Sequence, residues 1–296
     1  MCGIVGLLNK KSTERATLGE RVVPMLLCMG DRGPDSAGLA VFGPSTSGDA
    51  RRLSLYSPDL DYPWCALHSN LPTELAGELS AQKNHAILTT TGASSAVQSW
   101  LDEHHPEIEL LSVGRSMDLY KDTGHPRDIV ERYEIDRMSG SHCVGHTRMA
   151  TESAVTPVHS HPFTAGEDFC LVHNGSLSNP YDLRRMLEKR GIKFQTDNDT
   201  EAACRFLQWR TEEGDTIEEA LEVAFRELDG FYTLLIGTAD KIVLVRDAFA
   251  CKPAVVAETD DYVAIGSEFR TLAHLPQIHD ANLFEPAPEE IYSWSV

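Results

Sequence analysis

The chain has 296 residues, of which 42% are hydrophobic, and its formal net charge at pH 7 is −19. Such an acidic protein repels phosphate backbones, which argues against nucleic acid as its main partner. No stretch approaches the ~18 uninterrupted apolar residues of a membrane span, and no basic region precedes the first apolar run. We therefore expect a cytoplasmic protein without a membrane segment or a signal peptide.

A cysteine stands at position 2, at the head of the apolar run that reaches Leu8. If Met1 is removed, Cys2 carries a thiol and a free α-amine, which are a nucleophile and a base on one residue. The alternative is a small apolar residue that begins a buried strand. The seven cysteines contain no C-x-x-C pair, so we expect reduced thiols and neither a zinc ribbon nor an iron–sulfur site.

Residues 1–43 combine this run with a helix-like stretch ending near Met29, a polar loop at 31–38 and a second strand-like run. Residues 44–138 have a different texture, because they begin with many turn-forming residues. A strand, a helix and a strand are predicted to follow there, over residues 85–92, 94–105 and 108–114. We interpret residues 44–138 as a β-α-β lobe inserted into one domain that spans residues 1–296.

From Gly140 onward the pattern is strand-rich, then helical, then strand-rich again. Helical spacing of apolar residues follows three start signals, which are Asn179-Pro180, Thr200 and the capping box of Thr216 with Glu219. Three strands are then predicted, over residues 231–237, 241–247 and 262–266. Their apolar runs indicate sheets covered on both faces, and their short connections favour antiparallel pairing. The sequence thus predicts packed sheets with helices outside.

Four polar stretches interrupt the apolar segments, and each has an ordinary explanation on its own. Asn174-Gly175 is a tight-turn signal, and Asp199 stands where a helix N-cap would be. Arg148 is compatible with a surface ion pair, and residues 31–38 with a plain loop, since their glycines match no phosphate-binding spacing.

Five histidines and a cysteine raise the possibility of a metal site. The residues are His142, Cys143, His146, His159, His161 and His173. The i, i+2 spacing of His159 and His161 suits a strand more than a helical metal site, and no H-E-x-x-H pattern occurs. We therefore expect hydrogen-bonded histidine side chains and no metal.

The joint order of five short motifs points further than any one of them. They are Cys2-Gly3-Ile4, Arg32-Gly33-Pro34-Asp35, Gly145-His146-Thr147-Arg148, His173-Asn174-Gly175 and Asp199-Thr200-Glu201. In this order they resemble the class II glutamine amidotransferases, which are N-terminal-nucleophile hydrolases. The resemblance covers residues 1–43 and about 140–275, including LDGFYTLLIG, VRDAFACKP and AIGSE. It implies an α+β fold, a four-layer αββα sandwich of two antiparallel sheets.

The resemblance also implies a catalytic mechanism. The Cys2 thiolate would attack the γ-carbonyl of glutamine, with its own α-amine as the base, and release ammonia from a thioester. The Asn174 side-chain amide and the Gly175 backbone N–H would form the oxyanion hole, a task that suits glycine because the backbone can approach closely. Water would then hydrolyse the thioester to glutamate.

The charged end of the substrate has its own expected contacts. By the same resemblance, Arg148 and Thr151 would bind the α-carboxylate and Asp199 the α-ammonium. Arg32 and Gly33 would form the loop beside the nucleophile. The sequence departs from family members that make glucosamine phosphate, which continue W-A-T-H after GHTR, whereas this chain continues Met149-Ala150-Thr151-Glu152. We carry no binding role onto Glu152.

Within the family, the long segment between the RGPD and GHTR motifs resembles the separate amidotransferase subunits of archaeal-type glutamate synthase and of N-methylglutamate synthase. Because the sequence ends at Val296 without a second catalytic domain, we expect a synthase subunit as the partner that receives ammonia. FMN and iron–sulfur centres are expected in that partner, and no cofactor in this chain. Two alternatives stay open: an amidase for γ-glutamylmethylamide, and a non-catalytic assembly or regulatory subunit.

Overall fold

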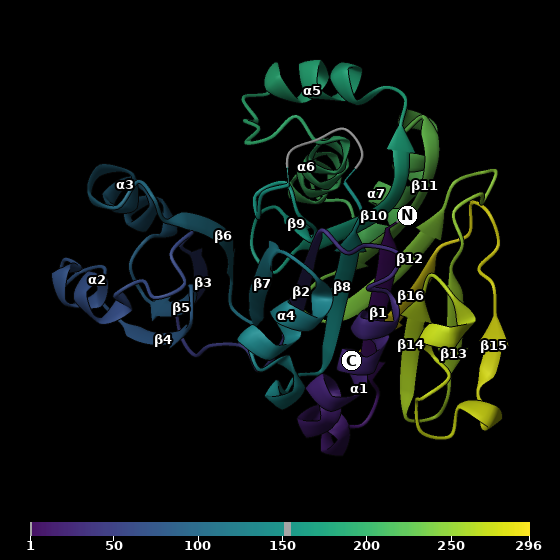
Figure 1. Cartoon of the computed structure of the whole chain (residues 1–296). Helices are drawn as coiled ribbons and strands as arrows, with labels where there is room; N and C mark the ends of the chain where they lie inside the picture. The colour runs from purple at the N-terminus through teal and green to yellow at the C-terminus, as the bar shows by residue number, and fades with distance from the viewer. Residues whose placement is uncertain (1, 151–154) are drawn as a thin grey trace.

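The computed structural model describes residues 2–150 and 155–296, and a seven-stranded antiparallel sheet lies at its centre (Figure 1). The strand order is β15-β13-β14-β1-β8-β2-β7. The strands are β1 (Gly3–Asn9), β2 (Ser36–Phe42), β7 (Met117–Thr123), β8 (His142–Arg148), β13 (Val255–Glu258), β14 (Tyr262–Gly266) and β15 (Asn282–Phe284). All seven residues of β1 are buried, as expected for an apolar strand flanked on both edges by neighbours.

A second, five-stranded antiparallel sheet packs against the first, with the strand order β16-β12-β11-β10-β9. Its strands are β9 (Phe163–Thr164), β10 (Cys170–Leu177), β11 (Gly230–Gly237), β12 (Lys241–Arg246) and β16 (Tyr292–Ser295). The core between the sheets joins Ile4 and Ile265 of the first sheet to Val172 and Leu235 of the second. These fully buried aliphatic side chains account for the apolar runs in the sequence.

Helices cover the two outer faces of the paired sheets. Those on the seven-stranded sheet are α1 (Leu18–Cys28) and α4 (Pro126–Arg132), and those on the five-stranded sheet are α5 (Pro180–Glu188), α6 (Asp199–Glu212) and α7 (Ile217–Glu227). Short 3-10 helices occur at Ser12–Thr17, Ile135–Arg137, Phe269–Thr271 and Ile278–Asp280. The predicted capping box of Thr216 and Glu219 begins α7. The predicted four-layer αββα sandwich is confirmed.

A separate four-stranded sheet stands at the left in Figure 1, with the order β4-β5-β3-β6 and its own apolar core. It comprises β3 (Arg51–Tyr56), α2 (Trp64–Asn70), β4 (Glu78–Gln82), β5 (His85–Thr90), α3 (Ser94–His104) and β6 (Glu109–Gly114). The predicted strand, helix and strand are β5, α3 and β6. Within residues 44–138, β7 pairs with β2 of the seven-stranded sheet and α4 contacts α1. The separate sheet therefore occupies residues 51–114, and the single-domain interpretation stays a prediction.

The position of β14 differs from the expectation that it follows β11 and β12 in one sheet. β11 and β12 pair antiparallel across a short turn, as predicted, but β14 lies in the other sheet between β1 and β13. The reason is that the segment after β12 includes β13 and crosses to the first sheet. No helix among residues 2–150 and 155–296 is long and apolar enough to cross a membrane.

Candidate active site

Cys2 lies at the edge where several strands of both sheets end. It precedes β1, whose first residue Gly3 pairs with Thr147 near the end of β8. On the other side, β14 ends at Gly266 opposite Val5. The second sheet contributes β10, which contacts both β1 and β8. Segments far apart in sequence therefore meet around one partly exposed thiol.

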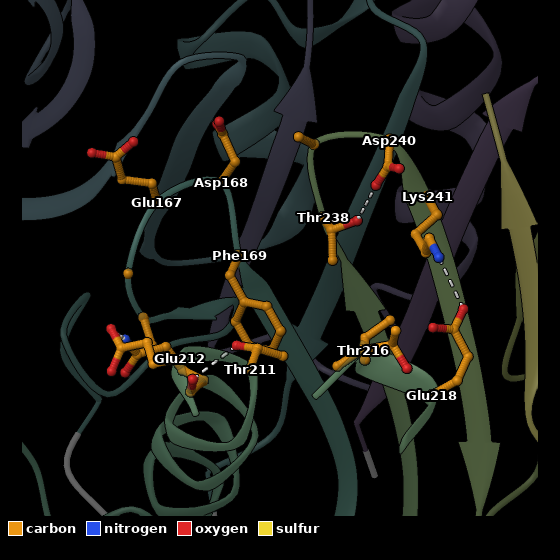
Figure 2. Close-up of a pocket in the computed structure, with 15 residues that line it drawn as sticks. Glu167, Asp168, Phe169, Thr211, Glu212, Thr216, Glu218, Thr238, Asp240 and Lys241 are labelled. Atoms are coloured by element: carbon orange, nitrogen blue, oxygen red, sulfur yellow. Dashed lines mark hydrogen bonds and ion pairs between the residues drawn. The ribbon is translucent and has the colours of Figure 1, made fainter. Parts of the chain in front are cut away.

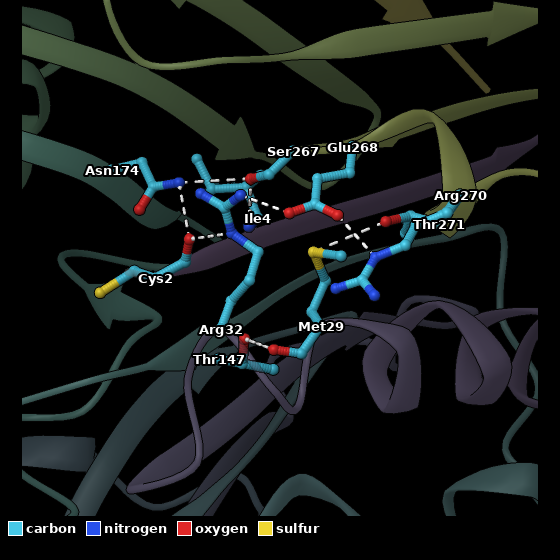
Figure 3. A network of polar contacts seen from close by, with 10 residues as sticks. All are labelled: Cys2, Ile4, Met29, Arg32, Thr147, Asn174, Ser267, Glu268, Arg270 and Thr271. Carbon is cyan, nitrogen blue, oxygen red and sulfur yellow. Dashed lines mark hydrogen bonds and ion pairs between the residues drawn. The ribbon is translucent and has the colours of Figure 1, made fainter.

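The backbone of Cys2 is held by two side chains (Figure 3). Its carbonyl oxygen accepts hydrogen bonds from Asn174 Nδ2 at 3.2 Å and from Arg32 Nε at 3.1 Å. The sulfur points away from this network, and its distance to the carbonyl oxygen of Met149 is 3.9 Å. The nucleophile candidate is thus anchored through its carbonyl while the thiol faces the cleft.

Two residues without a predicted role complete the network. Ser267 Oγ accepts hydrogen bonds from Ile4 N at 2.9 Å and from Asn174 Nδ2 at 3.2 Å. Glu268 forms an ion pair with Arg32 at 2.5 Å, which lowers the pKa of the Glu268 carboxyl. In the sequence, both residues belong to the AIGSE stretch, which contributed to the family resemblance but was assigned no functional role.

The loop that contains Arg32 packs directly on the end of β8. A Cβ atom on Gly33 would lie 2.3 Å from the carbonyl carbon of Thr147, so a larger residue would displace one of the two segments. Asp35 N donates to the Arg148 carbonyl at 3.0 Å, and the Asp35 carboxylate accepts from Ala150 N at 2.8 Å. This loop therefore fixes the backbone that carries Arg148.

A cleft of about 540 Å³ opens beside Cys2. Four of the predicted residues contribute to its wall, namely Cys2, Arg148, Gly175 and Asp199. Gly175 has a φ of +145°, and a Cβ there would lie 1.9 Å from the Phe231 carbonyl oxygen, so the position requires glycine. Asn174 and Gly175 belong to β10 rather than to a tight turn, and Arg148 is buried at the end of β8.

Asp199 is the first residue of α6, and its carboxylate lies at the positive end of the helix dipole. Its Oδ2 accepts a hydrogen bond from Leu177 N at 2.8 Å. The N-cap of α6 is Asn198, whose side chain accepts from Thr200 N at 2.8 Å. The capping task therefore falls to Asn198, and Asp199 contributes to the cleft wall.

Three buried histidines, His146, His161 and His173, lie at or next to the cleft wall. His161 and His173 contribute to the cleft wall, and the His146 and His161 rings lie against each other at a tilt of 36°, with centroids 4.1 Å apart. Burial lowers the pKa of His146 to about 3 and also lowers those of His161 and His173, so all three are neutral at pH 7. In the part of the chain that the structure describes, no three His, Cys, Asp or Glu side chains are grouped to hold a metal ion.

Three predicted residues, Asn174, Arg32 and Gly33, lie beside the cleft rather than in its wall, and Asn174 bonds to the Cys2 carbonyl. Arg32 bonds to the Cys2 carbonyl and to Glu268, and Gly33 packs on β8. Thr151 and Glu152 lie outside the described residues.

A second hollow, of about 530 Å³, lies where the β11–β12 turn meets α6 and α7 (Figure 2). Its wall carries several acidic side chains, and Glu218 is bonded to Lys241 at 3.0 Å. Phe169 contributes to this wall, and Cys2 is not among the lining residues. The cysteine cleft, in contrast, combines a thiol with both an arginine and a carboxylate.

Comparisons with known proteins agree on one family. Residues 146–274 match the model of a glutamine amidotransferase domain. The chain is 45% identical to the glutamine amidotransferase-like protein GlxB of Rhizobium meliloti, over 99% of this chain and 98% of that protein. It is 29% identical to a putative glutamine amidotransferase of Methanothermobacter thermautotrophicus, over 99% of both.

A solved structure supports the fold. Glutamine phosphoribosylpyrophosphate amidotransferase from B. subtilis superposes with a TM-score of 0.64 at 17% identity. The superposition covers 99% of this chain and 47% of that protein, so the chain spans about half of its length.

Proposed function

The chain belongs to the class II glutamine amidotransferases, and we propose that it hydrolyses the γ-amide of glutamine through a thioester on Cys2. The observation that carries the proposal is the cleft itself, in which a thiol, a guanidinium and a carboxylate share one wall. Free glutamine needs all three, because its reactive amide lies at one end and its two charges at the other.

Arg148 and Asp199 have charges suited to the two charged groups of an amino acid. The Arg148 guanidinium would bind the α-carboxylate through two parallel N–H donors, a geometry that lysine cannot supply. The Asp199 carboxylate would bind the α-ammonium. Both belong to regular elements, β8 and α6, which hold them in fixed positions. Thr151 is proposed as a further contact to the α-carboxylate.

Catalysis would begin at the α-amine of Cys2, which takes the thiol proton directly or through one water. The thiolate then attacks the γ-carbonyl carbon, and the carbonyl oxygen becomes an oxyanion. When the tetrahedral intermediate collapses, ammonia leaves with the transferred proton and the thioester remains. Attack by water on the thioester releases glutamate and restores the thiol.

The Asn174 amide would donate to the oxyanion by giving up its hydrogen bond to the Cys2 carbonyl. Both of its N–H groups are engaged in the structure, one with the Cys2 carbonyl and one with Ser267. Turning the first toward the oxyanion does not leave the Cys2 carbonyl unpaired, because Arg32 Nε also donates to it. The Gly175 N–H is proposed as the second donor.

The released ammonia needs an acceptor, which we propose is a synthase subunit of the glutamate-synthase or N-methylglutamate-synthase type. FMN and iron–sulfur chemistry would belong to that partner. Support comes from the similarity to the amidotransferase-like protein GlxB, which covers 99% of this chain and 98% of that protein. An N-methylglutamate-synthase partner would extend the substrates to γ-glutamylmethylamide, whose leaving group is methylamine.

The test is ammonia release from glutamine by the purified chain, alone and with the synthase subunit, compared with its Cys2→Ala variant. We expect release by the wild type and none above background by Cys2→Ala. Cys65→Ala, at an exposed cysteine of helix α2, is the matched control and should retain activity. A wild-type chain that is inert alone and in the assembled complex would contradict the proposal and favour a non-catalytic subunit. Methylamine release from γ-glutamylmethylamide, measured in parallel, separates the two substrates.

A further inference from the structure

The Thr200 hydroxyl lies at the centre of a buried cluster beside the cleft. Its Oγ1 is 2.9 Å from His161 Nε2 and 3.0 Å from His173 Nδ1. A third neighbour, Asp199 Oδ1, is 3.4 Å away. Thr200 is 1% exposed, so water does not compete for these contacts.

The hydrogen atoms of this cluster can be assigned by counting donors. Each neutral imidazole has one N–H, and a hydroxyl has one O–H and two lone pairs. The outer ring nitrogens, His161 Nδ1 and His173 Nε2, are buried and have no hydrogen-bond partner within the described residues. A buried N–H group without an acceptor costs more free energy than a buried ring nitrogen whose lone pair has no donor. Both N–H groups therefore belong on the nitrogens that face Thr200.

The assignment leaves one direction for the Thr200 hydrogen. If both histidines donate to Oγ1, its lone pairs are occupied and its O–H points to Asp199 Oδ1. The other carboxylate oxygen, Oδ2, already accepts from Leu177 N at 2.8 Å. Both oxygens of Asp199 then have a fixed donor, one from β10 and one from α6.

From this arrangement we infer that Thr200, held by His161 and His173, is a positioning residue that fixes the Asp199 carboxylate and so selects substrates with a free α-ammonium group. The inference rests on the proposed function, because it concerns the residue proposed to bind that ammonium. The histidines act as neutral donors and do not take part in proton transfer to the substrate.

The sharpest test removes the hydroxyl and compares two substrates. Thr200→Val keeps the shape of the side chain but has no hydroxyl. We expect it to raise KM for glutamine about tenfold, with kcat within about twofold, since one hydrogen bond to a charged group is lost. For 5-amino-5-oxopentanoate, which is glutamine without its α-amine, wild type and variant should have equal kcat/KM.

Thr200→Ser, which restores a hydroxyl, is the matched control and should recover most of the affinity for glutamine. Equal losses with both substrates, or no loss with glutamine, would overturn the inference. If the wild type releases no ammonia, the proposed function fails by itself. Calorimetric binding of glutamine to Cys2→Ala, with and without Thr200→Val, then decides the inference: tenfold weaker binding supports it and unchanged binding overturns it.

Discussion

At the scale of single residues, two arginines share one carboxylate but differ in what else they touch. Arg32 pairs with Glu268 and donates to the carbonyl of Cys2, whereas Arg270 pairs with Glu268 at the surface and is 51% exposed. Arg32 therefore couples the carboxylate to the nucleophile's backbone. Its contribution should appear in the chemical step rather than in substrate binding.

We expect Arg32→Lys to lower kcat about tenfold and to leave KM within about twofold, because an ammonium cannot hold the carbonyl and the carboxylate in the same fork geometry. Steady-state ammonia release measures both constants. Arg270→Lys is the matched control, with kcat unchanged. An Arg32→Lys variant that alters KM alone would assign Arg32 to substrate binding instead.

The motifs in the sequence predicted the cleft residues because each motif is local. Cys2, Arg148, Gly175 and Asp199 all contribute to one wall. Ser267 and the hydroxyl cluster at Thr200 were missed, since their importance comes from contacts between segments far apart in the sequence. His161 and Thr200, for example, are 39 positions apart. A histidine in the sequence does not show which hydroxyl it will face.

At the scale of elements, Asp122 of β7 joins the separate four-stranded sheet to the main body. This carboxylate is 3% exposed and accepts from Tyr133 Oη at 2.6 Å, Arg132 Nη1 at 2.5 Å and Asn84 Nδ2 at 3.1 Å. Asn84 precedes β5, while Arg132 and Tyr133 lie at the end of α4. One buried charge thus links the two sheets and a helix of the outer layer.

Asp122→Asn should lower the free energy of unfolding by about 3 kcal/mol, because it leaves Arg132 without its buried partner. Urea denaturation measures this change. Asp136→Asn, at an exposed carboxylate nearby, should stay within about 0.5 kcal/mol of the wild type. Equal stabilities for the two variants would show that the Asp122 cluster does not fasten the sheets.

The separate sheet was only partly predictable, and the reason is its exposure. β5 has a buried apolar face and was recognised, whereas none of the five residues of β4 is buried, so β4 shows no hydrophobic period. β3 and α2 adjoin the turn-rich stretches, which hid their regular structure. Sheet membership is equally non-local, as the position of β14 beside β1 illustrates.

At the scale of the whole molecule, five buried neutral histidines link stability to pH. Burial lowers the pKa of His85 and His146 to about 3 and of His142 to about 4, and it also lowers those of His161 and His173. The unfolded chain binds protons near the ordinary histidine pKa of ~6.5, whereas the folded chain does not. The contribution of these histidines to the free energy of unfolding is therefore complete above that pH and is lost as the pH falls toward 4.

The variant His142→Gln isolates the contribution of one histidine. In the wild type, His142 lies outside the cleft wall and its ring stacks on Phe42. Between pH 6 and 4.5, the fall in unfolding free energy should be shallower in this variant by up to about 1.4 kcal/mol per pH unit. His279→Gln, at an 80% exposed histidine, should keep the wild-type slope. Identical slopes for all three proteins would mean that His142 is protonated in the folded state.

In the proposed mechanism, Cys2 acts with its own α-amine as the base. The most direct test of this role uses a single preparation with a removable leader ahead of Cys2. Ammonia release from glutamine is measured before and after the leader is cleaved. Cleavage that exposes the amine should raise the rate by at least about 100-fold, the usual contribution of a positioned base. The same rate before and after cleavage, on a chain with an unchanged unfolding transition, would contradict the account.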